Sequence, residues 1–262
     1  MELIQSKDNA VLKSVKKLKQ KKYRDECNCF FIEGFRFFQE AEKARVIIDK
    51  IFLSNEFINR NSEYAAMLEK EYRVYKVKDS LYRDICNTDK PQGISAVIKK
   101  SKTNLTAEKE KLYILADNIQ DPGNMGTIIR TAHAVNAAGI IYTKGTVDPY
   151  NDKTLRSTMG SVFYVPLIED NENLDFTCAL RRGGYKLVVS SLKADYDFYD
   201  ATYDNKLILA VGNEGNGISD LVEAMADMLI KIPMPGGAES LNVSIAAALM
   251  MYEVLRQRKN RS

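Results

Sequence analysis

Three short segments in the second half of the chain combine residue types that can form a ligand site. They are NIQDPGNMGTIIRTA (Asn118–Ala132), VGNEGNG (Val211–Gly217) and IPMPGGAESLNVS (Ile232–Ser244). Each follows an apolar run typical of a buried strand, and two of them lead into a helical pattern. In open parallel α/β sheets, such loops meet at the carboxyl ends of the strands, where ligands bind. The sequence therefore predicts one site, formed by three loops.

The middle segment places Gly212, Gly215 and Gly217 directly after a buried strand. Glycines allow backbone amides to approach a ligand closely. Their spacing, G-x-x-G-x-G, differs from the G-x-G-x-x-G fingerprint of dinucleotide-binding proteins, so it does not favour a nicotinamide cofactor. Glu214 lies inside this turn, where a functional role is favoured over that of an acid at the start of a helix.

The other two segments leave alternatives open. Asp121 and Asn124 can belong to the site or simply cap the following helix. Arg130 lies six residues after Asn124 and is either functional or an ordinary surface charge. Ser240 and Asn242 are either N-caps or part of a loop that offers amides to a cofactor. The single histidine, His133, is expected to be a packing residue rather than a ligand.

Apolar runs and helical periodicity indicate which elements position these loops. The second half predicts six strands, at residues 112–117, 139–143, 164–168, 186–190, 207–211 and 228–233. The predicted helices between and after them span residues 126–138, 153–163, 174–182, 219–227 and 242–257. Apolar strands that alternate with helices indicate a mostly parallel sheet covered on both faces.

The first hundred residues predict a smaller α/β unit. Its expected helices span residues 6–24, 36–44, 56–70 and 78–87, and its expected strands span residues 28–33, 48–54, 73–77 and 93–98. Residues 101–111 are polar and have no apolar face, as is typical of a linker. We therefore expect one domain at residues 1–100 and a second at residues 112–262.

Charge is distributed unevenly between these two parts. Residues 1–100 carry 21 Lys and Arg against 15 Asp and Glu, whereas residues 101–262 carry 17 against 20. Eight basic residues and a single acid, Asp8, fall between Lys7 and Arg24. This run is either a solvated amphipathic helix or a surface that contacts nucleic-acid phosphates, and the rest of the chain favours the second reading. The candidate contacts are Lys13, Lys16, Lys17 and Arg24.

Composition excludes several classes of protein. The chain has 262 residues, of which 45% are hydrophobic, so a substantial core can form. No apolar stretch reaches the roughly 20 residues of a membrane span, and the N-terminus lacks the pattern of a signal peptide. The four cysteines have no metal-ligand spacing, so we expect buried thiols, no metal site and a cytoplasmic protein.

Together the three segments resemble the three motifs of the SpoU (TrmH) family of RNA ribose 2′-O-methyltransferases. The pattern N-x-x-D-P-x-N-x-G-x-I-x-R-T-A matches from Asn118 to Ala132. G-N-E-G matches at residues 212–215, and I-P-M-x-G followed by E-S-L-N-V-S matches at residues 232–244. The first hundred residues resemble the L30e/L7Ae-like substrate-binding domain that often precedes this catalytic domain. Within it, F-I-E-G at residues 31–34 is similar to a turn that follows that domain's second strand, which adds Glu33 and Gly34 to the candidate RNA contacts.

The resemblance implies a C-terminal trefoil-knotted (SPOUT-type) methyltransferase domain, a homodimer and bound S-adenosylmethionine. By position it assigns cofactor contacts to five residues: Gly212, Asn213, Gly217, Ile232 and Leu241. It also assigns catalytic positions to Asn124, Arg130, Glu214, Ser240 and Asn242. Because a guanidinium stays protonated in proteins, we expect Arg130 to grip a phosphate and stabilise developing negative charge rather than act as a base.

The resemblance favours ribosomal RNA as substrate, because a separate substrate-binding domain suits a large folded RNA. Transfer RNA is the first alternative. A second is a non-catalytic RNA-binding protein of ribosome assembly, although every candidate catalytic residue is present. A nucleotide-dependent oxidoreductase is a third and needs a different glycine order. The sequence does not separate housekeeping modification from antibiotic resistance, nor does it identify the nucleotide.

Overall fold

The computed structural model describes residues 1–101 and 111–260. The chain forms two compact units: Met1–Lys102 with Tyr150–Leu155, and Thr103–Pro149 with Arg156–Ser262. The short segment Tyr150–Leu155 thus groups with the first unit. The predicted domains, at residues 1–100 and 112–262, place this segment in the second. The predicted linker lies almost entirely outside the described residues.

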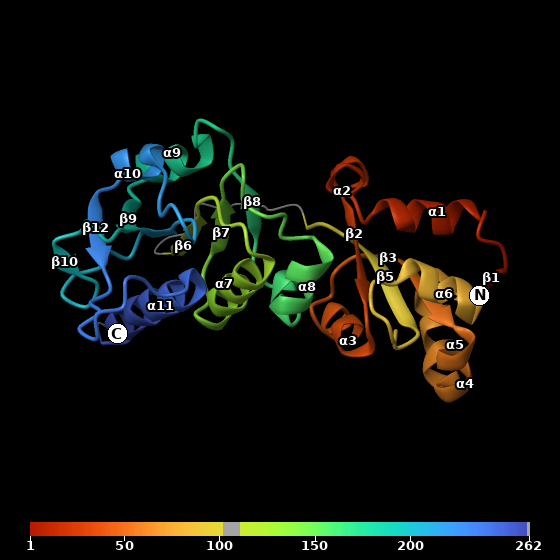
Figure 1. Ribbon diagram of the computed structural model, residues 1–262. Helices are drawn as coiled ribbons and strands as arrows, with labels where there is room; N and C mark the ends of the chain where they lie inside the picture. Colours follow the sequence, from red (N-terminus) through yellow and green to blue (C-terminus); the bar gives the residue numbers. More distant parts are fainter. Residues whose placement is uncertain (102–110, 261–262) are drawn as a thin grey trace. The chain divides into compact units, whose positions relative to one another are not determined.

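The first unit contains a five-stranded sheet in the order β1-β4-β3-β5-β2. Parallel pairs join β1, β4 and β3, whereas β5 runs antiparallel to both β3 and β2. The elements, visible in Figure 1, are β1 (Glu2–Ile4), α1 (Ala10–Lys17), α2 (Lys21–Cys27), β2 (Cys29–Glu33), α3 (Phe35–Lys43), β3 (Ile48–Ser54), α4 (Asn55–Arg60), α5 (Ser62–Glu71), β4 (Val74–Val77), α6 (Asp79–Ile85) and β5 (Ile94–Lys99).

The basic N-terminal segment is two helices rather than one. The helix α1 ends because the amides of Leu18, Lys19 and Gln20 bond carbonyls three residues back, and Gln20 then adopts an extended conformation. Leu12 and Val15 of α1 are buried against the sheet, so the lysines occupy the exposed faces of the helix. The predicted amphipathic pattern is therefore confirmed, whereas the break between the two helices at residues 18–20 was not predicted.

The second unit contains a seven-stranded, fully parallel sheet in the order β10-β12-β9-β11-β6-β7-β8. The elements of this part of the chain are β6 (Leu112–Ala116), α7 (Pro122–Ala134), β7 (Gly139–Tyr142), α8 (Asp152–Thr158), the 3₁₀ helix η1 (Ser161–Phe163), β8 (Leu167–Glu169), α9 (Asp175–Arg182), β9 (Lys186–Ser190), β10 (Tyr196–Asp197), β11 (Leu207–Val211), α10 (Asp220–Ala224), β12 (Met228–Lys231) and α11 (Val243–Lys259). The division between the two units falls within α8, after Leu155.

Helices cover both faces of this sheet. Alternate strand residues such as Ile114 and Leu209 pack with the apolar sides of α7 and α11, which form one core. The intervening residues, such as Leu115 and Ile208, pack on the other face with Leu180 of α9 and Val222 of α10. The predicted α/β class with a mostly parallel sheet is confirmed.

Some element boundaries differ from the predicted ones for local reasons. The helix expected from residue 126 begins at Pro122, because the Asp121 side chain accepts the Asn124 amide as an N-cap and proline suits the first helical position. The strand expected at 164–168 begins at Leu167, after Pro166. The first unit's predicted helix at 56–70 is broken at Asn61, and the short strands β1 and β10 were not predicted.

Candidate active site

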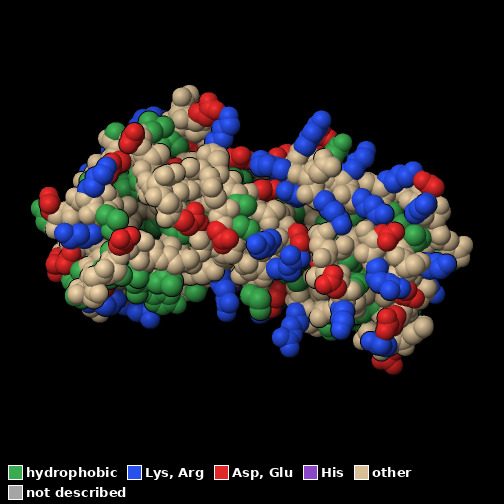
Figure 2. All heavy atoms as spheres, viewed as in Figure 1, with side chains coloured by type: hydrophobic (Ala, Val, Ile, Leu, Met, Phe, Trp, Pro, Cys, Tyr) green, Lys and Arg blue, Asp and Glu red, His purple; other side chains and the backbone are tan. Residues whose placement is uncertain are grey.

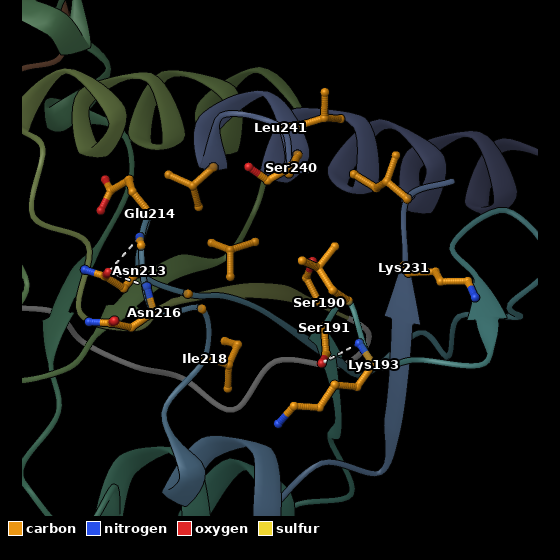
Figure 3. Close-up of a pocket in the computed structure, with 18 of the residues that line it drawn as sticks. Ser190, Ser191, Lys193, Asn213, Glu214, Asn216, Ile218, Lys231, Ser240 and Leu241 are labelled. Atoms are coloured by element: carbon orange, nitrogen blue, oxygen red, sulfur yellow. Dashed lines mark hydrogen bonds between the residues drawn. The ribbon is translucent and has the colours of Figure 1, made fainter. Parts of the chain in front are cut away.

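A cavity of about 430 Å³ lies at the carboxyl edge of the parallel sheet in the second unit. The loops after three adjacent strands line it: residues 190–193 after β9, 212–218 after β11 and 232–241 after β12. Figure 3 shows side chains from these loops converging on the cavity, with Ser240 and Leu241 entering from the segment before α11. The cavity therefore lies at the strand ends, where the sequence predicts the site.

Gly212 is required by the close approach of two backbone segments. Asn213 and Gly217 exchange backbone hydrogen bonds of 2.8 and 3.0 Å, which closes a tight loop. The Asn213 side-chain oxygen accepts the amides of Gly215 and Asn216, both at 2.9 Å. A Cβ at Gly212 would overlap the carbonyl of Gly217 and the amide of Ile218. Only glycine therefore allows this loop to line the cavity in its present conformation.

The first and last loops meet the middle loop through a directional chain of side-chain hydrogen bonds. Asn242 caps α11, because its side-chain oxygen accepts the Ser244 amide at 2.9 Å. Its amide nitrogen must therefore point the other way, and it donates to the Asn124 side-chain oxygen at 2.9 Å. The Asn124 amide nitrogen in turn donates to a Glu214 carboxylate oxygen at 2.9 Å. The helix cap at one end and the acceptor-only carboxylate of Glu214 at the other thus require the same orientation of both side-chain amides.

Two further contacts attach the middle loop to the end of β6. Asp117 is buried and accepts the Ser219 amide at 2.7 Å and the Thr143 hydroxyl at 2.9 Å. The Asn213 amide donates to the backbone carbonyl of Asn118 at 2.9 Å. The bonds to Ser219 and Asn213 join residues 102 and 95 positions apart in sequence, so the site exists only in the folded unit.

Hydrogen bonding keeps the Glu214 carboxylate ionised. Burial opposes ionisation, but the bonds from the Asn124 side chain and from the backbone of Gln120 and Asp121 outweigh it. The pKa of Glu214 is therefore lowered below its ordinary value of 4.5. A carboxylate held in this way can accept hydrogen bonds and attract positive charge, but it is a weak proton acceptor at neutral pH.

The sequence reasoning missed one wall of the cavity. Ser191 donates its hydroxyl to Glu223 at 3.1 Å, and Lys193 donates to the other oxygen of that carboxylate at 3.1 Å. The hydrogen bonds from Lys193 and Ser191 lower the pKa of Glu223, and the bond from Lys193 has the larger effect. The sequence does contain a signal for this wall. KLVVS at residues 186–190 is predicted to be a buried strand, and the loop after a parallel strand lies at the same edge of the sheet as the other strand-end loops.

The structure brings most of the candidate site residues of the second unit together. The seven that line the cavity are Gly212, Asn213, Glu214, Gly217, Ile232, Ser240 and Leu241. Asn124 and Asn242 do not line it but connect to Glu214 through the chain described above. Arg130 is exposed on α7, about two turns beyond Asn124, and has no bond to this cluster. His133 stacks on the Tyr164 ring at 4.5 Å, which agrees with a packing role.

The basic residues of the first unit are held mainly by local contacts. Lys13 pairs with Asp8 at 2.9 Å, Lys16 lies 3.8 Å from Asp84, and the Lys17 nitrogen lies 5.2 Å from the centre of the Tyr23 ring. Figure 2 shows Lys and Arg side chains spread over the helices of this unit. Exposed pairs of this kind are weak, so these lysines remain available to phosphates.

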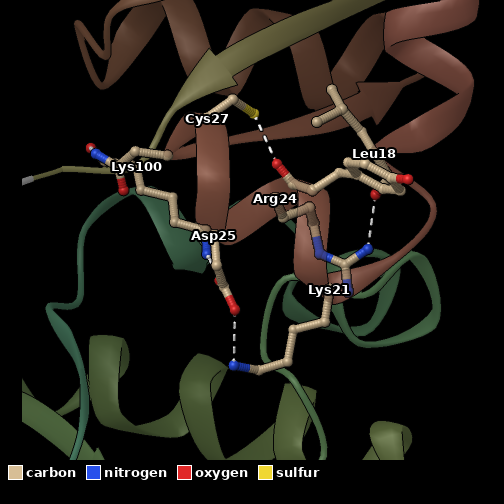
Figure 4. Close-up of polar contacts among 8 residues, drawn as sticks. Leu18, Lys21, Arg24, Asp25, Cys27 and Lys100 are labelled. Carbon is tan, nitrogen blue, oxygen red and sulfur yellow. Dashed lines mark hydrogen bonds and ion pairs between the residues drawn. The ribbon is translucent and has the colours of Figure 1, made fainter.

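Arg24 is a correction to the predicted RNA contacts. Its side chain is 4% exposed, and its guanidinium donates to the backbone carbonyl of Leu18 at 2.6 Å, as Figure 4 shows. It therefore joins α2 to the end of α1 rather than facing solvent. Next to it, Lys21 and Lys100 share Asp25 at 2.9 and 2.6 Å. Cys27 is exposed, not buried as predicted, because it lies at the end of α2 rather than in the strand.

Glu33 and Gly34 occupy the turn between β2 and α3. Glu33 accepts the Asn87 amide at 2.9 Å. Gly34 has a φ of 104°, a conformation that favours glycine, and its carbonyl accepts the first helical amide bond, from Phe38. Both residues thus have structural roles in this turn.

The cavity suits a nucleoside-sized cofactor. Its volume lies within the range of about 300 to 1,000 Å³ usual for small-molecule sites. It combines backbone amides in a glycine loop with carboxylates, the Lys193 ammonium and apolar side chains. In the described part of the chain, no group of three or more potential metal ligands occurs, and no helix has the length and apolarity needed to cross a membrane.

Comparison with protein families gives two matches. Residues 111–252 match the SpoU rRNA Methylase family, and residues 9–96 match the MRM3-like substrate binding domain.

Comparison with individual proteins agrees with these matches. The chain is 34% identical over 254 residues to the 23S rRNA (guanosine(2553)-2′-O)-methyltransferase RlmP of Bacillus subtilis, covering 97% of this chain and 99% of that protein. An AdoMet-bound rRNA methyltransferase from Sinorhizobium meliloti has a TM-score of 0.85 at 30% identity, over 97% of both chains. The SpoU methyltransferase AviRb of Streptomyces viridochromogenes, in complex with AdoMet, has a TM-score of 0.84 at 28% identity, over 96% of this chain and 98% of that one.

Proposed function

Because the chain belongs to the SpoU rRNA methylase family, we propose that it methylates a ribose 2′-hydroxyl of ribosomal RNA with S-adenosylmethionine as donor. The observation that carries the proposal is the Ser244–Asn242–Asn124–Glu214 chain, which attaches three separate loops to one cavity. The similar protein from Bacillus subtilis is named for this reaction on 23S rRNA, and two similar structures hold AdoMet.

The residues that line the cavity can hold the cofactor without a metal. The backbone at Gly212, Ile232 and Leu241 would hold the cofactor, and the loop closed by Asn213 and Gly217 keeps the glycine-rich segment in place. When bound, S-adenosylmethionine supplies an electrophilic methyl group. The protein's contribution is then largely alignment of the hydroxyl with that group, which in favourable cases is worth roughly 7–11 kcal/mol.

The site residues divide into holding and charge-stabilising roles. Glu214 and Asn124 hold the loops in register, and Asn242 sets their orientation. Ser240 lines the cavity, and we assign it a hydrogen bond to the target ribose of the RNA. We assign Arg130 to binding a substrate phosphate and stabilising negative charge on the 2′-oxygen. Its exposed guanidinium makes no other contact in the described structure.

Replacement of Arg130 by Lys tests that last role, since it keeps the charge but loses the fork. We expect turnover to fall while RNA affinity, measured by filter binding, stays near the parent value. Near-complete retention of turnover with unchanged RNA affinity would remove Arg130 from the mechanism.

The exposed apolar side chains of α11 support a homodimer. Ile245, Leu249 and Tyr252 lie at helical spacing on one face and are 52%, 42% and 53% exposed. Apolar side chains gather over α11 in Figure 2. A stripe of this kind is typical of an interaction surface, and a second copy of the chain is the proposed occupant. The trefoil knot and the cytoplasmic location, where ribosomes are assembled, stay predictions.

The test of the function is methylation in vitro with labelled S-adenosylmethionine. Purified ribosomal RNA and transfer RNA are offered separately, and ribose-methylated positions are mapped. We expect label in ribosomal RNA, on a ribose. Label only in transfer RNA would favour the alternative substrate, and label on a base would contradict the reaction. Failure to bind the cofactor in isothermal titration would favour a non-catalytic RNA-binding protein.

A further inference from the structure

Cations gather at the amino edge of the parallel sheet, opposite the cavity. Each of three adjacent central strands begins with a lysine or directly after one: Lys111 before β6, Lys186 at the start of β9 and Lys206 before β11. The backbone places these lysines side by side, because the Lys186 amide bonds the Lys206 carbonyl at 3.0 Å and the Leu207 amide bonds the Lys111 carbonyl at 3.1 Å.

Three arginines join these lysines from the ends of two helices. Arg181 and Arg182 form the last turn of α9, beside a hollow of about 420 Å³ that Lys186 also lines. Arg258, near the end of α11, donates to the backbone carbonyl of Asn205 at 2.6 Å, one residue before Lys206. Six cations from five segments therefore occupy one edge of the second unit; we call them the amino-edge cluster.

The amino-edge cluster is not balanced by acids. Asp227 is the one carboxylate that lines the hollow, 3.3 Å from Arg181 and 3.6 Å from Lys186. In sequence, Glu110 directly precedes Lys111 and Asp204 lies two residues before Lys206, so the six cations still outnumber the acids next to them. The contrast with the surroundings is large, because residues 101–262 carry 17 basic residues against 20 acids. A local positive excess in an acidic half of the chain indicates a negatively charged ligand.

Structural roles account for only part of the cluster. Lys206 donates to the Gly183 carbonyl at 2.8 Å, which satisfies the end of α9, and cations there also suit the helix dipole. Arg182 and Lys186 are exposed, however, and neither is needed for that cap. Their side chains border the hollow and retain donors that can reach a phosphate.

We propose that the amino-edge cluster is a second RNA-backbone site, which binds phosphates of the substrate RNA away from the reacting ribose. The inference rests on the proposed RNA substrate. A row of cations on adjacent strands, with arginine guanidinium groups at its end, can bind several phosphates of one RNA backbone. An acidic protein segment is the competing occupant.

The position of the site has a consequence for the substrate. The central strands are five residues long, which corresponds to roughly 17 Å between the two edges of the sheet. An RNA that reaches both edges must fold around the unit. This favours a large structured RNA over a short single strand.

The test uses the full-length protein with Arg182 and Lys186 both replaced by Gln. Each is exposed, so the fold should be retained, and a thermal melt verifies this. The control is Arg256→Gln, which removes a cation already bonded twice to Glu253 at 2.7 and 2.8 Å. RNA affinity is measured across a salt series on ribosomal RNA fragments and on an oligonucleotide that carries only the methylated loop, and cofactor affinity is measured by titration.

We expect the double variant to bind the long fragment about tenfold more weakly at low salt. Its log–log salt slope should be smaller by about 1.4, that is, about 0.7 for each lost phosphate contact. Binding to the short oligonucleotide and to S-adenosylmethionine should not change, and the Arg256→Gln control should match the parent.

An unchanged affinity and salt slope on the long fragment would overturn the second site while leaving the proposed methylation intact. Equal weakening on the short oligonucleotide would also overturn it, because the cluster would then act at the reacting ribose or through general charge. Failure of the parent protein to bind both RNA and cofactor would instead overturn the proposed function and, with it, this inference.

Discussion

The carboxyl edge of the large sheet and the basic surface of the small unit are built in opposite ways. At the carboxyl edge, Asn124 joins residues 90 and 118 positions away, and Asp117 bonds an amide 102 positions away. On the basic surface, the contacts are separate exposed ion pairs, such as Lys21 with Asp25 and Lys13 with Asp8, whether the partner is near in sequence or distant, as Asp84 is from Lys16.

The carboxyl edge therefore depends on the geometry of its hydrogen bonds, whereas the basic surface depends on its summed charge. A network of uniquely oriented amides loses its geometry as a unit when one member is removed, because each hydrogen bond orients the next group. Exposed lysines act through summed charge, so each contributes a small, salt-dependent share. We therefore expect all-or-none effects at the carboxyl edge and graded effects on the basic surface. The following predictions test that contrast.

The largest effect is expected for Gly212→Ala. The new Cβ would overlap the Gly217 carbonyl, so the glycine loop must open and the cavity lose its wall. We expect S-adenosylmethionine affinity, measured by isothermal titration, to fall about 100-fold, or roughly 2.8 kcal/mol.

Gly215→Ala is the matched control in the same loop. A Cβ at that position lies 3.6 Å from the Asn213 side-chain oxygen, an ordinary contact, and the amide bond to Asn213 is kept. Equal losses in the two variants would mean that the close approach at Gly212 is not what shapes the cavity.

Asn124→Ala should reduce turnover about 100-fold, the size of effect that misplacement by about 1 Å can have. Because Asn124 does not line the cavity, cofactor affinity should fall much less. The measurement is kcat with saturating cofactor and RNA. Thr127→Ala, on the same helix, is the control, since the Thr127 hydroxyl bonds only the Gly123 carbonyl.

Asn242→Asp sharpens the same point. A carboxylate keeps the cap on Ser244 but cannot donate to Asn124, so turnover should fall although α11 remains capped. Parent-like turnover in this variant would show that the direction of the hydrogen-bond chain does not matter.

On the basic surface, Lys13→Gln combined with Lys17→Gln should weaken RNA binding only about fivefold, with a salt slope smaller by about 1.4. Turnover at saturating RNA should stay near the parent value. The control is Lys43→Gln with Arg45→Gln, two exposed cations elsewhere in the same unit. A salt-insensitive affinity of the parent protein would contradict an electrostatic surface altogether.

The smallest effect is a pH dependence of stability at Glu214. Because the folded protein lowers the pKa of this carboxyl, its contribution is fully present above the ordinary value of 4.5 and is lost as the pH falls below that value through the folded-state pKa. The carboxylate is exposed and screened, so we expect less than about 1 kcal/mol. Denaturant unfolding of the parent and of Glu214→Gln should differ at pH 7, and the difference should shrink as the pH falls below 4.5.

The sequence allowed the carboxyl-edge site to be located because its signals are local. Buried strands, turn residues and glycines follow one another within a few positions, and the rule that parallel strands present their carboxyl ends together does the rest. The strands β3, β9 and β11 were predicted with their observed bounds. The break between α1 and α2 and the burial of Arg24 were missed, because the turn at residues 18–20 lies within a continuous amphipathic pattern and Arg24 folds back onto the Leu18 carbonyl.

The sequence by itself determined the class of fold, the strand-end loops and the polar groups available in them, since periodicity and turn chemistry act over short distances. Only the tertiary structure decided which of those groups meet. A side-chain amide has a donor and an acceptor end, and nothing in the sequence around Asn124 shows which groups those ends meet. The acceptor-only carboxylate of Glu214 takes the donor end of Asn124, and the capping residue Asn242, 118 residues away, donates to its oxygen only once the sheet has formed.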